Sequence, residues 1–325
     1  MASAKPLGLL LVALALSSHF SKTQAQLSAN YYDVTCPNLR GMVATAFLFQ
    51  MNLIRVITAP ASLLRVAFHD CAVDGCQGSI LLNSQPGVTD EKLSKRNLGI
   101  QNLDVIHSIK STIEARCPGV VSCADLIVLV AHEAIKYSAG PTLPLVFGRK
   151  DARFASTGNA DVQLLPADAT VDQVLNAFGQ MGIDTAGTVA LLGSHTLGVA
   201  HCANIVNRLY PAPDMTLSQP MNLFRLNNLK LQCPPNFNSF TTIANDLTNT
   251  IFDGTYYRSA LAGRGLLTID DRLANDPRTK PFMQNFGMNT PAFRQSFKDA
   301  FLKMTSFKVL TGSQGEVRRD CRFVN

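Results

Sequence analysis

Apolar residues recur at helical spacing over most of the chain, and the apolar/polar alternation typical of strands is scarce. Residues 103–115 place four apolar side chains on one helix face. Residues 122–138 are strongly apolar and stop at Gly140 and Pro141, which predicts a central, buried helix. The pattern therefore predicts a mainly α-helical protein.

Further helices are predicted at residues 171–181, at 185–192 after a capping Asp184, and near 291–305. The proline-rich residues 210–240 are predicted to form a loop. A chain of this length can bury a large core, as one big domain or as two closely packed lobes.

The first 25 residues have the features of a signal peptide. Lys5 precedes an apolar run at residues 7–16, and small residues precede a cleavage point after Ala25. The run is too short to span a bilayer, and no later segment has the uninterrupted apolar length of a membrane helix. We therefore expect residues 1–25 to be removed, leaving residues 26–325 as one secreted domain with no membrane partner.

The net charge argues against one class of partner. It is +6 at pH 7, and two of the contributing lysines lie in the leader. No block of lysine and arginine forms a patch typical of nucleic-acid binding, so we expect no nucleic-acid partner. The mild positive charge suits contact with acidic extracellular polymers.

All eight cysteines follow the leader, and an even number in a secreted chain predicts four disulfides. Zinc is an alternative for Cys71 and Cys76, although no second Cys/His pair of finger spacing lies nearby. Spacing alone leaves the pairing open.

A charged cluster interrupts the apolar residues 63–82. Thr58 and Pro60 predict the start of a helix, which places Arg65 and His69 four residues apart on one face. A guanidinium and an imidazole on an apolar helix lose solvation unless they contact a partner or a ligand. The pair fits either a structural ion pair with an acid or a chemical site.

Oxygen-bearing residues follow this pair. Asp70, residues 73–75, Gln77 and Ser79 supply carboxylate, carbonyl and hydroxyl oxygens that suit a calcium ion. The alternative is a polar loop held by a short disulfide.

A second candidate histidine, His195, ends the apolar residues 185–192 within Gly193-Ser194-His195-Thr196-Leu197-Gly198. A lone histidine there is more often a satisfied core residue than a ligand. Haem enzymes, however, need a proximal imidazole with a hydrogen-bond acceptor, and a distal base and cation. His195, His69 and Arg65 together meet that requirement.

These residues belong to motifs that follow one another in order. The motifs are Tyr31-Tyr32-Asp33-Val34-Thr35-Cys36-Pro37, Leu64-Arg65-Val66-Ala67-Phe68-His69-Asp70-Cys71, Val121-Ser122-Cys123-Ala124-Asp125, Gly148-Arg149-Lys150-Asp151, Leu165-Pro166, Gly193-Ser194-His195-Thr196-Leu197-Gly198 and Phe252-Asp253. In them the sequence resembles the class III secretory plant peroxidases, over essentially the whole chain after the leader. The resemblance implies a mainly α, two-lobed, all-helical haem peroxidase fold with minor short strands, one haem b between distal and proximal lobes, and a monomer.

The resemblance also implies a disulfide pairing and a structural ion pair between Asp125 and Arg149. The implied disulfides are Cys36–Cys117, Cys71–Cys76, Cys123–Cys321 and Cys202–Cys233.

It further implies the roles of the residues around the haem. His195 is expected to bind the haem iron, with Asp270 accepting its other N–H and Phe68 contributing to haem binding. His69 is expected to act as general base and then acid, and Arg65 to stabilise developing charge.

Asn97 is expected to accept a hydrogen bond from His69, which would hold the other ring nitrogen free to face hydrogen peroxide. A buried or exposed asparagine without this role is the alternative. Pro166 matches a proline whose carbonyl binds the phenolic donor. Lys95 and Asn204 stand where some relatives have phenylalanine, which argues against tight binding of flat hydrophobic phenols.

Two calcium ions are implied, one on each side of the haem. The matching residues are Asp70, Val73, Gly75 and Ser79 on the distal side, and Thr196, Thr248, Ile251 and Asp253 on the proximal side. Gln77 and Asn245 replace a usual aspartate at each site, so we predict weaker calcium binding at both. Asp246 is a candidate to replace Asn245.

The sequence thus predicts a secreted haem peroxidase, in the extracellular space or cell wall, that reduces hydrogen peroxide while oxidising small phenols by one-electron steps. The chain stops at Asn325, without the tail of vacuolar relatives. One alternative is a haem-binding extracellular protein with weak catalysis and a binding or wall-associated role. Another, a serine hydrolase built on Ser194, lacks the Gly-x-Ser-x-Gly elbow. The other histidines after the leader, His107, His132 and His201, are expected on helix or loop surfaces and not at a metal.

Overall fold

The most deeply buried helix, α4 (Cys123–Tyr137), has the position that its apolar sequence predicts. Every residue from Cys123 to Ile135 is buried. The hydroxyl of Ser122 accepts a hydrogen bond from the Asp125 N–H at 3.1 Å, which caps the start of the helix. α2 (Ala59–Ala72), α1 (Leu39–Ile54) and α3 (Leu103–Glu114) pack against it.

The computed structural model describes residues 27–211, 221–238 and 240–325. The predicted signal peptide, residues 1–25, lies outside the described residues. In the part of the chain that the structure describes, no helix is long and apolar enough to cross a membrane.

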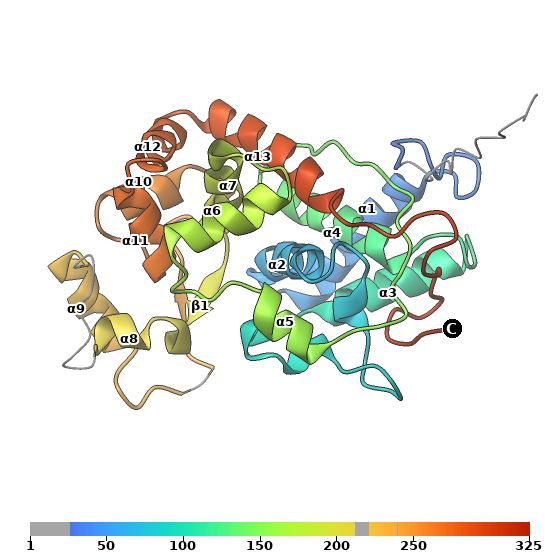
Figure 1. Ribbon diagram of the computed structural model, residues 1–325, viewed down its shortest axis with the longest axis horizontal. Coiled ribbons are helices and arrows are strands. Elements are labelled where there is room, and N and C mark those ends of the chain that lie inside the picture. The colour runs from blue at the N-terminus through green and yellow to red at the C-terminus, as the bar shows by residue number, and fades with distance from the viewer. Residues whose placement is uncertain (1–26, 212–220, 239) are drawn as a thin grey trace, which may run out of the picture.

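Two groups of helices make up most of the fold (Figure 1). One contains α1 to α4, and the other contains α6, α7 and α10 to α13, with α13 packed along α7. The helices of the second group and their neighbours are α5 (Thr157–Gln163), α6 (Val171–Gln180), α7 (Thr185–Leu192), α8 (Val206–Leu209), α9 (Leu223–Gln232), α10 (Thr255–Leu261), α11 (Thr268–Asn275), α12 (Lys280–Met288) and α13 (Thr290–Thr305).

Short elements complete the architecture. The 3₁₀-helices are η1 (Ser79–Leu81), η2 (Glu91–Leu93), η3 (Lys95–Asn97), η4 (Gly193–Thr196) and η5 (Cys202–Asn204). Strands β1 (Val199–His201) and β2 (Thr242–Ala244) pair antiparallel, with Ala200 opposite Ile243. The prediction of a mainly α fold with minor strands is confirmed.

One prediction of local structure is wrong, and another is confirmed. Helix α9 lies within residues 210–240, which were predicted as a loop because of their prolines; all five of these prolines lie outside α9, on either side of it. Thr58 and Pro60 correctly predicted the start of α2, which begins at Ala59 with Pro60 in its first turn, although the Thr58 side chain makes no capping hydrogen bond to the described residues.

The four disulfides pair as the family resemblance implies, and all eight cysteines take part. The zinc alternative for Cys71 and Cys76 is therefore excluded in this structure, because the two sulfurs are bonded to each other. The bridge from Cys123 to Cys321 joins residues 198 positions apart and ties the C-terminal segment to the start of α4.

Candidate active site

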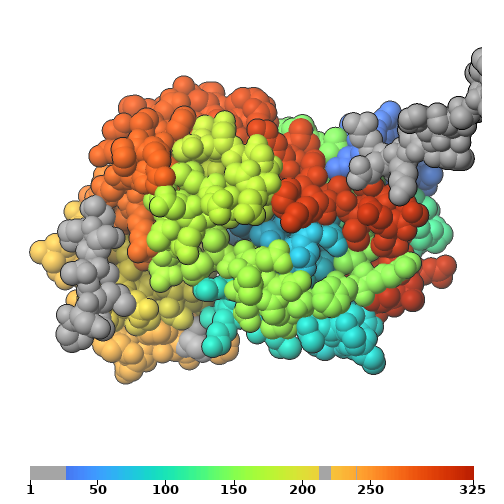
Figure 2. Space-filling view, in the orientation of Figure 1, coloured from blue at the N-terminus to red at the C-terminus, as the bar shows by residue number. Residues whose placement is uncertain are grey.

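Helix α2 holds Arg65 and His69 one turn apart on a face that retains some exposure. In the space-filling view, part of the blue α2 segment is visible between the yellow-green residues of α5 and α6 and the red C-terminal segment (Figure 2). Phe68 packs against Phe178 of α6, with ring centroids 5.6 Å apart.

The protonation pattern of His69 follows from its neighbours. Its Nδ1 lies 2.6 Å from the Asn97 carbonyl oxygen, and the amide nitrogen of Asn97 donates to the Glu91 carbonyl at 2.8 Å. Because that amide oxygen can only accept, Nδ1 carries the hydrogen. Nε2 is left as an acceptor, and it receives a hydrogen bond from Arg65 Nε at 3.1 Å.

The surroundings keep His69 neutral. Desolvation and then the positive charge of Arg65 lower the pKa of His69 to about 3, although the bond to Asn97 acts in the opposite direction. A neutral imidazole whose Nε2 carries a lone pair and no hydrogen is the form that a general base requires.

The guanidinium of Arg65 is fixed by the backbone on either side of Asn97. Nη1 donates to the Leu98 carbonyl at 3.0 Å and Nη2 to the Arg96 carbonyl at 3.1 Å. Burial lowers the pKa of Arg65 to about 10, so it remains a cation at neutral pH. The site therefore combines a neutral base and a fixed positive charge.

The second histidine, His195, lies on η4 directly after α7. Its Nδ1 lies 2.9 Å from Asp270 Oδ1, and the other carboxylate oxygen accepts from the Leu267 N–H at 2.9 Å. The side chain of His195 is 30% exposed, so Nε2 can still bind an incoming ligand. The turn requires glycine at 193, since a Cβ there would lie 2.0 Å from the Tyr257 hydroxyl.

Two close contacts join the segment after His195 to the distal side. Gly198 has φ +82°, and a Cβ there would lie 2.6 Å from the Ala61 side chain of α2. A Cβ at Gly99 would lie 2.5 Å from the His201 ring. The residues present fit a haem: an oriented imidazole with a free nitrogen on η4, and a base and a cation on α2.

An oxygen-rich cluster lies beside His195. The Thr196 hydroxyl is 2.7 Å from Asp246 Oδ2 and 3.3 Å from Asp253 Oδ1, and the Ile251 carbonyl is 3.5 Å from the same hydroxyl. The Thr248 hydroxyl is 3.1 Å from Asp253 Oδ1. Two carboxylates, two hydroxyls and a carbonyl are a donor set that suits calcium.

Asn245 makes a single side-chain hydrogen bond among the described residues. Its amide nitrogen donates to the Leu197 carbonyl at 2.7 Å, and its buried Oδ1 has no hydrogen-bond partner among the described residues. Asp246, one position later, is buried and provides the second carboxylate.

The distal oxygen-rich loop differs from the proximal cluster. Asp70 Oδ2 accepts from the Gly78 N–H at 2.9 Å, and burial raises the pKa of Asp70 to about 7. Ser79 Oγ and Glu91 Oε2 are buried without hydrogen-bond partners in the described part of the chain. Such orphaned oxygens fit a missing cation or water. Glu91, which sequence reasoning missed, gives no motif of its own.

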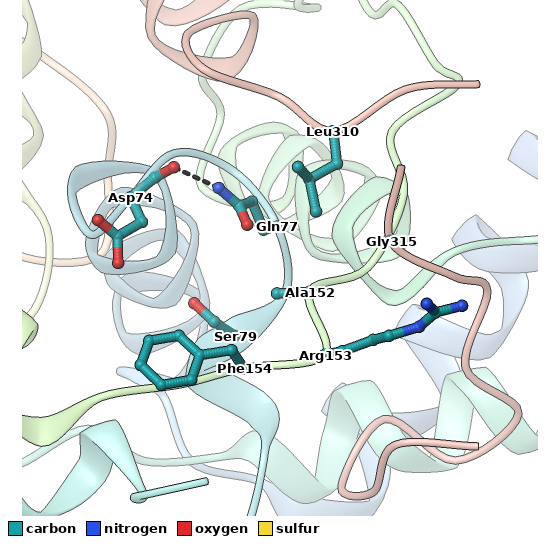
Figure 3. Close-up of a pocket in the computed structure, with 8 residues that line it drawn as sticks. All are labelled: Asp74, Gln77, Ser79, Ala152, Arg153, Phe154, Leu310 and Gly315. Atoms are coloured by element: carbon teal, nitrogen blue, oxygen red, sulfur yellow. Dashed lines mark hydrogen bonds between the residues drawn. The ribbon is translucent and has the colours of Figure 1, made fainter. Parts of the chain in front are cut away.

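The amide nitrogen of Gln77 is hydrogen-bonded within this loop. Figure 3 shows that nitrogen donating to the Asp74 carbonyl, in a cavity of about 230 Å³ that Ser79 and Arg153 also line. The Asp74 carboxylate is held by Asn159 and by Gln163 of α5, at 2.7 and 2.8 Å.

The turns that carry the predicted backbone ligands are tightly constrained. Val73 is fully buried, and Gly75 has φ +99°. A Cβ at Gly75 would lie 2.4 Å from the Lys308 carbonyl, so only glycine fits this turn.

The residues predicted to lie near the phenolic substrate are at or near the surface. Pro166 follows α5, and its carbonyl accepts from the Ala169 N–H at 3.1 Å, which leaves one lone pair for a ligand. Lys95 and Asn204 are exposed.

Two other predictions have opposite outcomes. Arg149 Nη1 donates to Asp125 Oδ1 at 2.7 Å with both side chains fully buried, so the expected ion pair is confirmed.

His132 was expected at the surface, but it is buried because α4 is covered on all sides. Its Nδ1 accepts from the Leu143 N–H at 3.2 Å, and burial lowers the pKa of His132 to about 4.

The serine hydrolase alternative finds no support. Ser194 Oγ donates to the Leu191 carbonyl at 2.7 Å, and it contacts no histidine or acid among the described residues that would activate it.

Comparison with known proteins agrees with this site. The peroxidase family model matches residues 48–289. Peroxidase 21 of Arabidopsis thaliana is 38% identical, with both chains fully covered, and peroxidase 29 of the same plant is 39% identical over 91% of this chain and 88% of its own. Peroxidase 15 of Ipomoea batatas is 35% identical, again with both chains fully covered. The chain therefore belongs to the peroxidase family, and it is a haem peroxidase of the class III plant type.

Proposed function

We propose that this enzyme is a secreted peroxidase that reduces hydrogen peroxide to water and oxidises small phenols by one-electron steps. One observation carries the proposal: His69 is held as a neutral base by Asn97, directly beside the Arg65 guanidinium. The haem, when bound, supplies a redox-active iron that takes up the oxidising equivalents of the peroxide.

The distal residues manage protons and charge. His69 Nε2 accepts a proton from one peroxide oxygen and returns it to the departing oxygen, which leaves as water. Arg65 stabilises the negative charge that develops as the O–O bond breaks. Asn97 keeps the tautomer of His69 that makes Nε2 the acceptor.

The proximal residues hold the cofactor. His195 would bind the iron through Nε2, and Asp270 would accept its Nδ1–H and increase the basicity of the ring. Phe68 would form part of the haem pocket on the distal side.

Phenolic donors would bind at an exposed edge of the haem near Pro166. The carbonyl of Pro166 retains one acceptor site for a phenol hydroxyl. Lys95 and Asn204 supply no aromatic surface there, so binding of flat hydrophobic phenols would be weak.

We propose up to two calcium ions with unequal affinities. At the proximal site Asp246 would replace Asn245 and keep two carboxylates, with Thr196, Thr248, Ile251 and Asp253 as the other ligands. The distal site, made by Asp70, Val73, Gly75 and Ser79, would bind more weakly because Gln77 brings no charge. The proposal also includes removal of residues 1–25, export to the extracellular space or cell wall, and a monomeric state.

Rapid-mixing absorption spectroscopy tests the function. The haem- and calcium-loaded protein should show a Soret band that bleaches within milliseconds of adding one equivalent of hydrogen peroxide and returns when a phenol is added. His69→Ala should keep the band and lose the fast bleach. A normal band that does not respond to peroxide in the wild type would favour a haem-binding protein with weak catalysis.

A further inference from the structure

Tyr256 of α10 shares an acceptor atom with His195. Its hydroxyl donates to Asp270 Oδ1 at 3.1 Å, and His195 Nδ1 lies 2.9 Å from the same oxygen. No motif in the sequence pointed to this tyrosine, which follows the Phe252-Asp253 motif by three residues.

The side chain of Tyr256 lies against both His195 and Asp270. Tyr256 is 4% exposed, and its ring meets the imidazole of His195 edge to face, with centroids 5.8 Å apart and planes at 83°. An ionised carboxylate can only accept, so the Tyr256 hydroxyl is the donor in its bond to Asp270.

Asp270 therefore receives three hydrogen bonds. Oδ1 accepts from His195 and Tyr256, and Oδ2 accepts from the Leu267 N–H. Each donor stabilises the carboxylate charge, and this weakens the hydrogen bonds that the carboxylate accepts from the other donors. The hydrogen bond between Asp270 and the imidazole N–H is consequently weaker than it would be if His195 were the only donor to the carboxylate.

We propose that Tyr256 is a positioning residue that limits the electron donation of His195 to the haem iron by competing for Asp270. The inference rests on the proposed ligation of haem by His195. A more strongly bonded Nδ1–H gives the imidazole more anionic character, which strengthens the iron–histidine bond and favours oxidised iron. With Tyr256 present, the Nδ1–H hydrogen bond and the iron–histidine bond would both be weaker than Asp270 alone would make them.

The chain offers a matched control on the same helix. Tyr257 is fully buried, and its hydroxyl donates to the Val189 carbonyl at 3.2 Å and not to Asp270. Tyr257→Phe removes one buried hydroxyl from α10, as Tyr256→Phe does, and leaves the three bonds to Asp270 in place.

The experiment compares the haem-loaded wild type with Tyr256→Phe, Tyr257→Phe and Asp270→Asn. Resonance Raman spectra of the reduced proteins give the iron–histidine stretch, and spectroelectrochemistry gives the iron reduction potential. Tyr256→Phe should move the stretch to higher frequency and the potential to a more negative value. Asp270→Asn should move both in the opposite direction, and Tyr257→Phe should match the wild type.

Each contrary result has a distinct meaning. A Tyr256→Phe spectrum that coincides with the wild type, or equal shifts in both tyrosine variants, would overturn the role of Tyr256 and leave the proposed function intact. A wild type with bound haem but no iron–histidine band would overturn ligation by His195, and this inference with it.

Discussion

The Asn97 carbonyl oxygen lies 2.6 Å from His69 Nδ1, and it decides which nitrogen of His69 can act as a base. Asn97 is itself fixed, because its amide nitrogen donates to the Glu91 carbonyl on the preceding 3₁₀-helix. A backbone carbonyl thus orients an amide, and the amide orients the imidazole. The chain of contacts explains why a residue 28 positions from His69 belongs to the site.

Asn97→Ala should slow the reaction with hydrogen peroxide. Without the acceptor at Nδ1, His69 can adopt the other tautomer or rotate, and fewer molecules present Nε2 as a base. Loss of such an orienting partner typically costs about 10- to 100-fold in activity. Stopped-flow measurement of the Soret bleach gives the rate constant, and a value equal to that of the wild type would show that Asn97 does not orient His69.

The reaction with peroxide should depend on pH through His69 in a defined direction. Only the neutral imidazole accepts a proton, and the pKa of His69 is lowered to about 3. The rate constant should therefore be flat from neutral pH down to about 4 and fall below that. Arg65→Leu removes a positive charge that lowers this pKa, so its inflection should move to higher pH. An inflection that stays in place would argue against coupling between Arg65 and His69.

How much the sequence could predict depends on whether a side chain's environment follows from its neighbours in the chain. The apolar run of α4 predicted a central helix, yet His132 within it was wrongly expected at the surface, since spacing does not show that every face is covered. The pair of Arg65 and His69 follows from helical spacing. Asp246 was a candidate because it adjoins Asn245 in the sequence. Tyr256 was not predicted, because only the packing of α10 on α11 brings its hydroxyl to Asp270.

Asp246→Asn should weaken calcium binding at the proximal cluster. The variant keeps the size of the side chain but removes one of two carboxylates, and ligand charge helps to set calcium affinity. We expect the dissociation constant of the tighter site to rise by about 10- to 100-fold or more. Isothermal titration of the calcium-stripped protein measures this directly.

Two further variants test the calcium assignment. Asp299→Asn removes an exposed carboxylate of α13 that bonds Gln295, and it should leave both affinities unchanged. Gln77→Asp restores a carboxylate to the distal loop and should tighten the weaker site. Nanomolar affinity at both sites of the wild type would contradict the predicted weakening, and an Asp246→Asn titration that matches the wild type would return the ligand role to Asn245.

Arg149→Met should destabilise the fold strongly while leaving the catalytic residues in place. Arg149 bonds Asp125 at 2.7 Å, and it also donates to the Thr305 carbonyl at the end of α13, so its loss leaves a buried carboxylate without its cation. Breaking a fully buried pair in this way costs about 3–5 kcal/mol in the free energy of unfolding. Denaturant titration with the disulfides intact measures the change. Arg278→Met, which removes a cation bonded to Asp276 at the surface, is the control and should change stability little. Equal losses in the two variants would mean that the buried pair has no special contribution.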